Sequence, residues 1–107
     1  MENAIHFTKA GLEQAKGKPG VILLDFWAQW CPHCGPVGQM VEELAGEYAG
    51  RAAIGKVDVD SEREIAMEYG VRSIPTVIIL KDGVEVDRKV GEMPYGAYAD
   101  AIEAALK

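Results

Sequence analysis

The stretch VILLDFWAQWCPHC, residues 21–34, runs from a nearly unbroken apolar segment into two cysteines that are two residues apart. An apolar run of this length is typical of a central β-strand covered on both faces of a sheet. The residues beyond Cys34 have helical periodicity. We therefore predict a strand over Val21–Ala28, a loop that carries Cys31, and then a helix.

Strand and helix patterns alternate along the rest of the chain. Further strands are predicted at Ala4–Phe7, Ala52–Val59, Pro75–Leu80 and Val84–Val90. The turn residues 81–83, Lys-Asp-Gly, are typical of an antiparallel hairpin between the last two strands. The order β-α-β-α-β-α-β-β-α predicts βαβ units closed by a hairpin, which is an α/β sandwich with a mixed sheet and helices on both sides.

End signals and apolar stripes locate four helices. Thr8 is expected to cap a helix that extends to Lys16. The second helix is predicted to end near Gly50, and its apolar stripe comprises Val37, Met40, Val41, Leu44, Ala45 and Tyr48. Ser61 and Glu64 form a capping-box pattern at the start of a short helix, and Pro94 suits the first turn of the last helix.

Length and charge limit the classes of function. The 107 residues, 49% of them hydrophobic, predict a single domain over residues 1–107 with one core. A net charge of −6 argues against nucleic acid as a partner, and no apolar run is long enough to cross a membrane. The N-terminus lacks a signal-peptide pattern, so a cytoplasmic protein is expected. The helix acids, including Glu42, Glu43 and Glu47, are interpreted as a solvated face without function.

The two cysteines admit three interpretations: a structural disulfide, part of a zinc site, or a redox dithiol. A disulfide between these cysteines would close a loop of about four residues and stabilise the fold by only about 2 kcal/mol, so a purely structural role is disfavoured. A structural zinc site needs four ligands, and the chain adds only His33 and His6 to the two thiols. A Cys-x-x-Cys pair beside a βαβ unit favours the redox dithiol, with no metal.

Local geometry predicts different roles for the two thiols. If Cys31 is the N-cap and Pro32 the first helical residue, the Cys31 sulfur can accept hydrogen bonds from the N–H groups of His33 and Cys34. The helix dipole also stabilises a thiolate at that position. Cys31 is therefore expected to be the accessible nucleophile, and Cys34, buried one turn further along, to resolve the mixed disulfide.

Asp25 interrupts the apolar strand. Period-two alternation places it on one face with Val21, Leu23 and Trp27. Burial should raise the pKa of Asp25 and leave it partly protonated near neutrality, which suits a group that takes a proton from Cys34. The alternative is an acid at the rim of the sheet, held by ordinary hydrogen bonds.

The chain resembles the thioredoxin family over essentially its whole length. The resemblance is carried by DFWAQWC (25–31) with Cys34, KVDVD (56–60), YGVRSIPT (69–76), KDG (81–83) and VG (90–91). It implies the thioredoxin fold, a central five-stranded mixed sheet flanked by four helices. It also implies thiol–disulfide exchange on protein substrates with no cofactor beyond the dithiol.

The resemblance further implies roles for individual residues. Cys31 would be the nucleophile, Cys34 the resolving thiol, Asp25 the buried acid, Lys56 its neighbour and Pro75 a cis-proline facing the disulfide. The substrate surface would comprise Trp30, Pro32, Ile74, Pro75 and Gly91, with Gly91 kept free of a side chain near the sulfurs or serving only as a turn residue. A flavin-dependent reductase of the thioredoxin-reductase type would restore the dithiol of a monomeric protein.

The sequence departs from the usual family pattern between and after the cysteines. Pro32-His33 replaces Gly-Pro, which frees the His33 N–H and adds a titratable imidazole. Both changes favour the Cys31 thiolate, and about 1.4 kcal/mol of such preference raises the potential by about 30 mV, so a less reducing protein is predicted. Alternatively His33 is solvated and has little influence. Gly35, Pro36 and Gly38 would cost about 5 kcal/mol in a helix interior, so irregular first turns are expected.

Three functional interpretations follow. The leading one is a protein-disulfide reductase that uses Cys31 and Cys34. Pro32-His33 suggests an alternative, disulfide oxidase or isomerase activity. A third possibility is a non-catalytic binding module that holds a partner on the apolar surface around Trp30, Ile74 and Pro75.

Overall fold

The computed structural model describes residues 3–107, which form one five-stranded sheet and four α-helices. The strands are β1 (Ile5–His6), β2 (Val21–Trp27), β3 (Ala52–Asp58), β4 (Thr76–Lys81) and β5 (Val84–Val90). The helices are α1 (Lys9–Lys16), α2 (Cys34–Glu47), α3 (Arg63–Glu68) and α4 (Tyr95–Leu106). The predicted element order and the five-stranded mixed sheet are confirmed.

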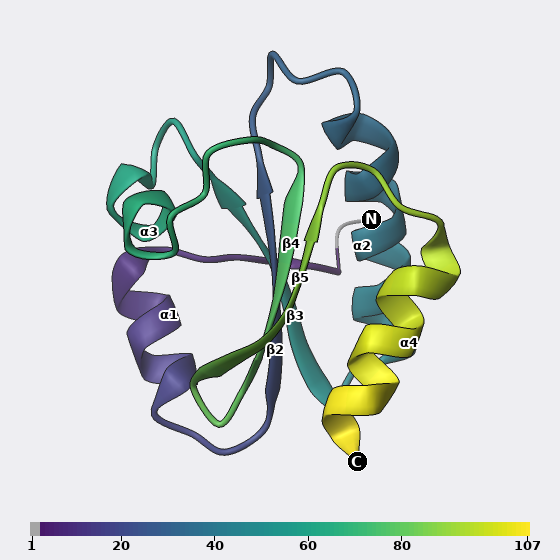
Figure 1. Cartoon of the computed structure of the whole chain (residues 1–107). Helices are drawn as coiled ribbons and strands as arrows, with labels where there is room; N and C mark the ends of the chain where they lie inside the picture. The colour runs from purple at the N-terminus through teal and green to yellow at the C-terminus, as the bar shows by residue number, and fades with distance from the viewer. Residues whose placement is uncertain (1–2) are drawn as a thin grey trace.

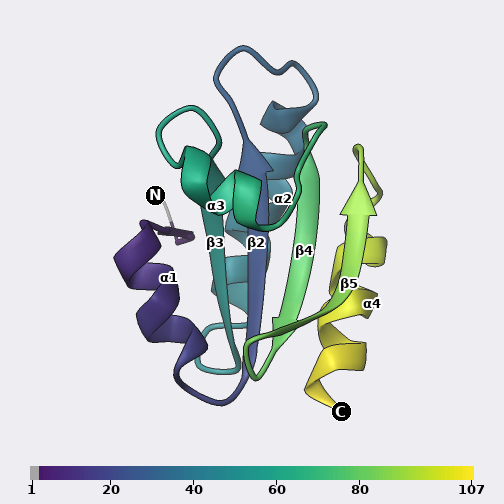
Figure 2. The same cartoon turned by 60° about the vertical axis from the view of Figure 1, so that its left-hand side comes forward.

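Strand β2 lies at the centre of the sheet, whose order is β1-β3-β2-β4-β5. It pairs in parallel with β3 and antiparallel with β4, and β5 closes the hairpin (Figure 2). Helices α1 and α3 cover one face of the sheet, and α2 and α4 cover the other (Figure 1). The helical layers therefore remove β2 from solvent on both faces.

Alternate residues of β2 point into two separate cores. Leu23 lies with Val41 and Tyr98 in the core beneath α2 and α4. Leu24 and Phe26 lie in the core beneath α1 and α3. This alternation places Asp25 on the α2 and α4 side, as period two predicts.

The predicted element ends needed small corrections. Strand β4 begins at Thr76 and not at Pro75, because proline has no N–H for the ladder. Thr8 caps α1 as predicted, since its hydroxyl accepts a hydrogen bond from the Gly11 N–H at 3.1 Å. Pro94 is the N-cap of α4 and not a residue of its first turn.

The predicted capping box at Ser61 is wrong. Helix α3 begins after Glu62, and Ser61 makes no cap hydrogen bond to it. The reason lies in the preceding turn, where the Asp58 carboxylate accepts hydrogen bonds from the N–H groups of Asp60 and Ser61. Glu64, the other half of the expected box, pairs with Lys9 at 2.5 Å.

Gly55 permits the close approach of β1 to β3. A Cβ atom at this position would overlap the Phe7 ring and lie 2.7 Å from the Ile5 carbonyl oxygen. We expect Gly55→Ala to lower the free energy of unfolding by about 3 kcal/mol, because the backbone of β1 would have to move. Urea unfolding monitored by circular dichroism measures this change.

Gly96→Ala is the matched control for that substitution. Gly96 lies in α4, where an added Cβ meets no atom within 4 Å, so the same change should stabilise the protein by up to about 1 kcal/mol. Equal unfolding midpoints for Gly55→Ala and the unsubstituted protein would refute the packing argument.

Candidate active site

The two cysteines form a disulfide at the end of the sheet where β2 meets α2. Cys31 lies in the loop after β2, and Cys34 is the first residue of α2, with their Cα atoms 5.4 Å apart. Cys31 is 8% exposed and Cys34 4% exposed. Cys31 is thus the more exposed residue of the pair, but most of its surface is covered.

Helix α2 begins two residues later than predicted. Its N-cap is His33, and the Cys34 N–H donates to the Cys31 carbonyl oxygen at 3.3 Å and not to the sulfur. Pro36 explains the shift, because it has no N–H to donate to the carbonyl of Pro32. The predicted N-cap at Cys31 is therefore wrong for this disulfide-bonded form.

The irregular first turns expected for α2 are also absent, because the helix is continuous from Cys34 to Glu47. Pro36 is the third residue of that helix, a position whose N–H has no acceptor within a helix. Gly35, the second residue, likewise lies in the first turn. Of these three residues, only Gly38 lies beyond the first turn, where a glycine lowers helix stability by about 1 kcal/mol relative to alanine.

Asp25 is buried as predicted, with no exposed surface. Within residues 3–107, neither of its carboxylate oxygens has a hydrogen-bond partner. Burial raises the pKa of Asp25 from the ordinary 3.8 to about 7; the positive charge of Lys56 works against this rise, and the negative charge of Glu42 adds to it. A group with this pKa can both give and take a proton near neutrality.

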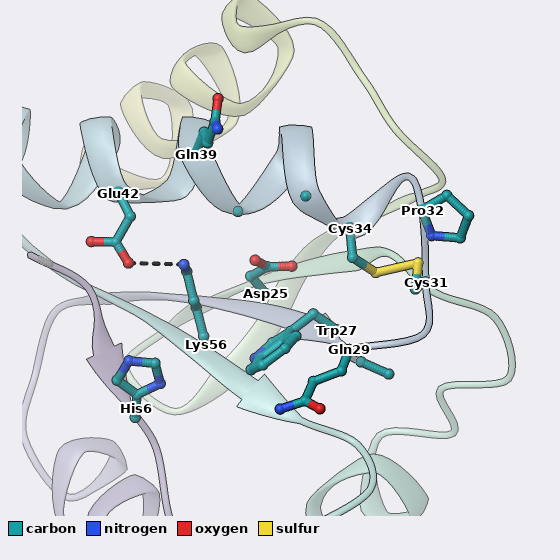
Figure 3. A pocket seen from close by; sticks show the side chains of 13 residues that line it. His6, Asp25, Trp27, Gln29, Cys31, Pro32, Cys34, Gln39, Glu42 and Lys56 are labelled. Atoms are coloured by element: carbon teal, nitrogen blue, oxygen red, sulfur yellow. Dashed lines mark ion pairs between the residues drawn. A yellow bond between two sulfur atoms is a disulfide. The ribbon is translucent and has the colours of Figure 1, made fainter.

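A cavity of about 360 Å³ lies beside the disulfide (Figure 3). Asp25 points into this cavity between Lys56 and the disulfide in the view shown. The lining residues come from β1, β2, β3, α2 and the loop before α2, and they include His6, Asp25, Trp27, Cys31, Cys34, Gly38, Glu42 and Lys56. The fold thus brings together the three predicted residues Asp25, Lys56 and Cys34.

Glu42 also belongs to this cavity, which corrects its interpretation as a solvated acid. Its side chain is only 20% exposed, and its Oε2 lies 2.8 Å from the Lys56 Nζ. Burial alone would raise the pKa of Glu42, but hydrogen bonds from Lys56 and from the N–H groups of Ala4 and Asn3 lower it to about 2. Helical spacing gave a signal, because Cys34, Gly38 and Glu42 are four residues apart and so share one face.

A shallow groove of about 630 Å³ lies next to the cysteine loop. Its lining includes His33, Met40, Ile74, Pro75, Gly91, Glu92 and Met93. The Ile74–Pro75 peptide bond is cis, and the Gly91 N–H donates to the Pro75 carbonyl at 2.8 Å. Three of the residues predicted for the substrate surface, Ile74, Pro75 and Gly91, therefore line one groove.

Gly91 is explained by its backbone conformation. Its φ is +89°, which favours glycine. A Cβ atom at this position would meet no atom within 4 Å, so its conformation, and not crowding by neighbouring atoms, accounts for the glycine.

Two acids at this end of the molecule were not predicted. Glu92 places its Oε1 3.0 Å from the His33 Nδ1, and Asp60 accepts a hydrogen bond from the Trp30 indole at 3.0 Å. Trp30 is 68% exposed, as expected for a residue of a binding surface. Glu92 directly follows Gly91 in sequence, but nothing local in the chain indicates its contact with His33.

Two features are absent from the part of the chain that the structure describes. Residues 3–107 contain no group of three or more His, Cys, Asp or Glu residues placed to hold a metal ion. None of the helices in this range is both long and apolar enough to cross a membrane.

The raised pKa of Asp25 predicts a pH-dependent stability. The unfolded chain loses this proton near pH 4 and the folded protein only near pH 7, so the free energy of unfolding falls between these values and stays low above them. Asp25→Asn removes this decline in the free energy of unfolding, which amounts to about 1.4 kcal/mol per pH unit between the two pKa values. The buried amide has no hydrogen-bond partner, and its desolvation cost offsets part of that stabilisation. We expect a net stabilisation of about 2 kcal/mol at pH 8 by urea unfolding.

Asp100→Asn, a change at an exposed position of α4, is the control and should follow the pH dependence of the unsubstituted protein. If Asp25→Asn retains the full decline in stability between pH 4 and 7, Asp25 is not the group that titrates there.

Comparisons with known proteins agree with this geometry. The thioredoxin family model matches residues 4–104. Thioredoxin 2 of Chlorobaculum tepidum is 47% identical over 83 residues, covering 78% of this chain and 76% of that protein. A thioredoxin of Staphylococcus epidermidis is 46% identical over 92 residues, covering 86% of this chain and 88% of that protein.

Solved structures give the same result. A single-site mutant of a thioredoxin from Halobacterium salinarum superimposes with a TM-score of 0.87 at 33% identity, covering 98% of this chain and 93% of that one. A thioredoxin of Malassezia sympodialis gives a TM-score of 0.84 at 34% identity, covering 94% and 87%. With its Cys-x-x-Cys disulfide in place, the chain belongs to the thioredoxin family of protein-disulfide oxidoreductases.

Proposed function

We propose that this protein reduces disulfide bonds of other proteins and is less reducing than thioredoxins that carry Gly-Pro between their cysteines. The main support is the position of the Cys31–Cys34 disulfide, which has the cavity of Asp25 beside it and the groove of Pro75 next to its loop. A partner bound in that groove would lie next to the cysteine loop, with a proton acceptor buried behind it.

The reaction proceeds in two exchanges. The Cys31 thiolate attacks one sulfur of a substrate disulfide, which forms a mixed disulfide and releases the first substrate thiolate. Cys34 then gives its proton to Asp25 and attacks the Cys31 sulfur, which releases the second substrate thiolate. Two electrons pass to the substrate, and the Cys31–Cys34 disulfide remains. A flavin-dependent reductase of the thioredoxin-reductase type returns the pair to the dithiol.

The proposed substrate surface is apolar and lies around the cysteine loop. The exposed Trp30 ring and the Pro32 ring flank Cys31, and Ile74 and Pro75 line the groove with Gly91. Apolar contact here would hold the residues on either side of a substrate disulfide while the sulfurs react. Lys56 does not belong to this surface; its positive charge lowers the pKa of the buried Asp25.

The low reducing power is attributed to Pro32-His33. His33 is two residues from the attacking Cys31 in sequence, and in the reduced form its N–H and its imidazole would favour the thiolate. The Glu92 carboxylate, 3.0 Å from the His33 Nδ1, opposes part of this effect with its negative charge. The net potential therefore depends on the pair His33–Glu92 and not on His33 alone.

We further propose a single-domain, monomeric, cytoplasmic protein. One sheet carries both cores, which supports one domain. The free edge strand β5 is irregular between Glu85 and Asp87 and carries four charged side chains, and such features oppose edge-to-edge pairing. The cytoplasm keeps protein thiols reduced, as a disulfide reductase requires.

Replacement of Cys34 by serine tests the exchange mechanism. Without a resolving thiol, Cys31 should accumulate as a mixed disulfide with a disulfide-bonded substrate such as insulin, seen as an added mass under non-reducing conditions. Cys31→Ser, the matched control, should trap nothing. Unaltered turnover by Cys34→Ser, or a binding activity that survives the loss of both thiols, would contradict the reductase proposal.

Exchange of Pro32-His33 for Gly-Pro tests the low reducing power. We expect the potential to fall by about 30 mV or more, equivalent to about 1.4 kcal/mol less preference for the thiolate, in a titration against glutathione. Glu92→Gln should move the potential in the opposite direction, because it removes the negative charge beside His33, and Asp100→Asn should leave the potential unchanged. An unchanged potential in the Gly-Pro variant would show that Pro32-His33 has no influence.

A further inference from the structure

We propose that Glu42 is a positioning residue for proton transfer at the redox centre, because it holds the Lys56 ammonium on its own carboxylate and so leaves Asp25 free to exchange a proton with Cys34. This inference rests on the proposed role of Asp25. Without Glu42, the ammonium could pair with Asp25 directly, and Asp25 would then be held as a carboxylate.

The strand register makes a direct pair between Asp25 and Lys56 possible. They are register partners on the neighbouring parallel strands β2 and β3, and both side chains line the same cavity. The Lys56 Nζ nevertheless lies 2.8 Å from the Glu42 Oε2, and neither Asp25 oxygen accepts a hydrogen bond from any described residue. Figure 3 shows the Lys56 amine directed at Glu42.

Backbone contacts fix the Glu42 carboxylate in this position. Its Oε1 accepts hydrogen bonds from the Asn3 N–H at 2.5 Å and the Ala4 N–H at 2.9 Å. Its Oε2 is thereby held toward the cavity, where it meets Lys56. Gly38, one turn closer to Cys34, lies beside the lysine, and a Cβ there would be in ordinary van der Waals contact with the Lys56 Nζ at 3.5 Å.

The charges in the cavity explain why two carboxylates and one ammonium suit proton transfer. Glu42 has a pKa of about 2 and remains ionised where Asp25 titrates, so Glu42 and Lys56 cancel each other. A proton on Asp25 then leaves the buried site neutral. When Cys34 gives its proton to the Asp25 carboxylate, Asp25 becomes neutral and the negative charge passes to the Cys34 sulfur, so the net charge of the buried site does not change.

Other titratable groups also face Asp25. Cys34 approaches from α2, Tyr98 from α4, and His6 of β1 lines the same cavity. The Tyr98 hydroxyl accepts from the Met93 N–H at 3.0 Å. Removal of the Glu42 charge is therefore the most direct test, because Glu42 pairs with Lys56, whose positive charge lowers the pKa of Asp25.

Glu42→Gln tests the proposal, because the amide oxygen can still accept the two backbone hydrogen bonds while the charge is lost. The pKa of Asp25 should fall by about one unit, since a nearby negative charge disappears and Lys56 becomes free to approach Asp25. The readout is the pH titration of the Asp25 carboxyl carbon by NMR in the disulfide form. An Asp25 pKa that is unchanged or higher would overturn the proposal.

Two further variants separate charge from structure. Glu43→Gln changes the neighbouring exposed acid of α2 and should leave the Asp25 titration unchanged. Glu42→Ala also loses the hydrogen bonds to Asn3 and Ala4, so it should be less stable than Glu42→Gln and yet show the same shift at Asp25. A shift in Glu42→Ala without one in Glu42→Gln would assign the effect to structure and refute the electrostatic role.

The pH dependence of exchange gives an independent readout. The midpoint for reduction of insulin should move about one pH unit lower in Glu42→Gln, following Asp25. The NMR titration of Asp25 needs no substrate. If it contradicts the Glu42 proposal, the trapping experiment with Cys34→Ser still tests the reductase proposal independently. Failure of trapping would instead remove the reductase proposal while the Asp25 titration still stood.

Discussion

Burial of the Asp25 carboxyl in the central strand is the constraint on which the site depends. Strand β2 has neighbours on both edges and helices on both faces, so a side chain in its middle cannot reach solvent. A lone carboxylate in such a place is costly, and the cost appears as a strong attraction for a proton. The same strand leads within six residues to Cys31, so the fold places the reactive sulfur in the loop that follows the strand of the proton acceptor.

The ion pair between Lys56 and Glu42 matters because it keeps Lys56 from pairing with Asp25. A lysine beside a buried aspartate normally forms an ion pair with it, which stabilises the fold and removes the aspartate from acid–base chemistry. Here a second carboxylate, tied to the backbone of residues 3 and 4, takes the lysine. The protein thus keeps a less stable arrangement around Asp25, in line with the general conflict between stability and activity at reactive sites.

Local sequence patterns were sufficient for the element order, the cysteine pair and the burial of Asp25, whereas the five-stranded sheet, Lys56 beside Asp25 and the cis Pro75 were expected only from the resemblance to the family. Period-two alternation placed Asp25 on the correct face, and the apolar stripe of α2 predicted its buried side. Glu42 and Glu92 were missed because their partners lie far away in the chain, Lys56 on β3 and His33 before α2. An acid on a helix is usually solvated, and only the packing of residues 3 and 4 and of β3 against α2 shows that Glu42 is not.

The helix-breaking residues after Cys34 also depend on three-dimensional context. Counted by propensity, Gly35, Pro36 and Gly38 should weaken α2 by about 5 kcal/mol. The start of the helix at Cys34 puts Pro36 in the first turn, where its missing N–H costs nothing, and puts Gly38 against the Lys56 side chain. A Cβ at position 38 would be in ordinary van der Waals contact with that ammonium, at 3.5 Å. The glycine that propensity counts against the helix therefore lies on the face of α2 where Glu42 holds the lysine, one turn away.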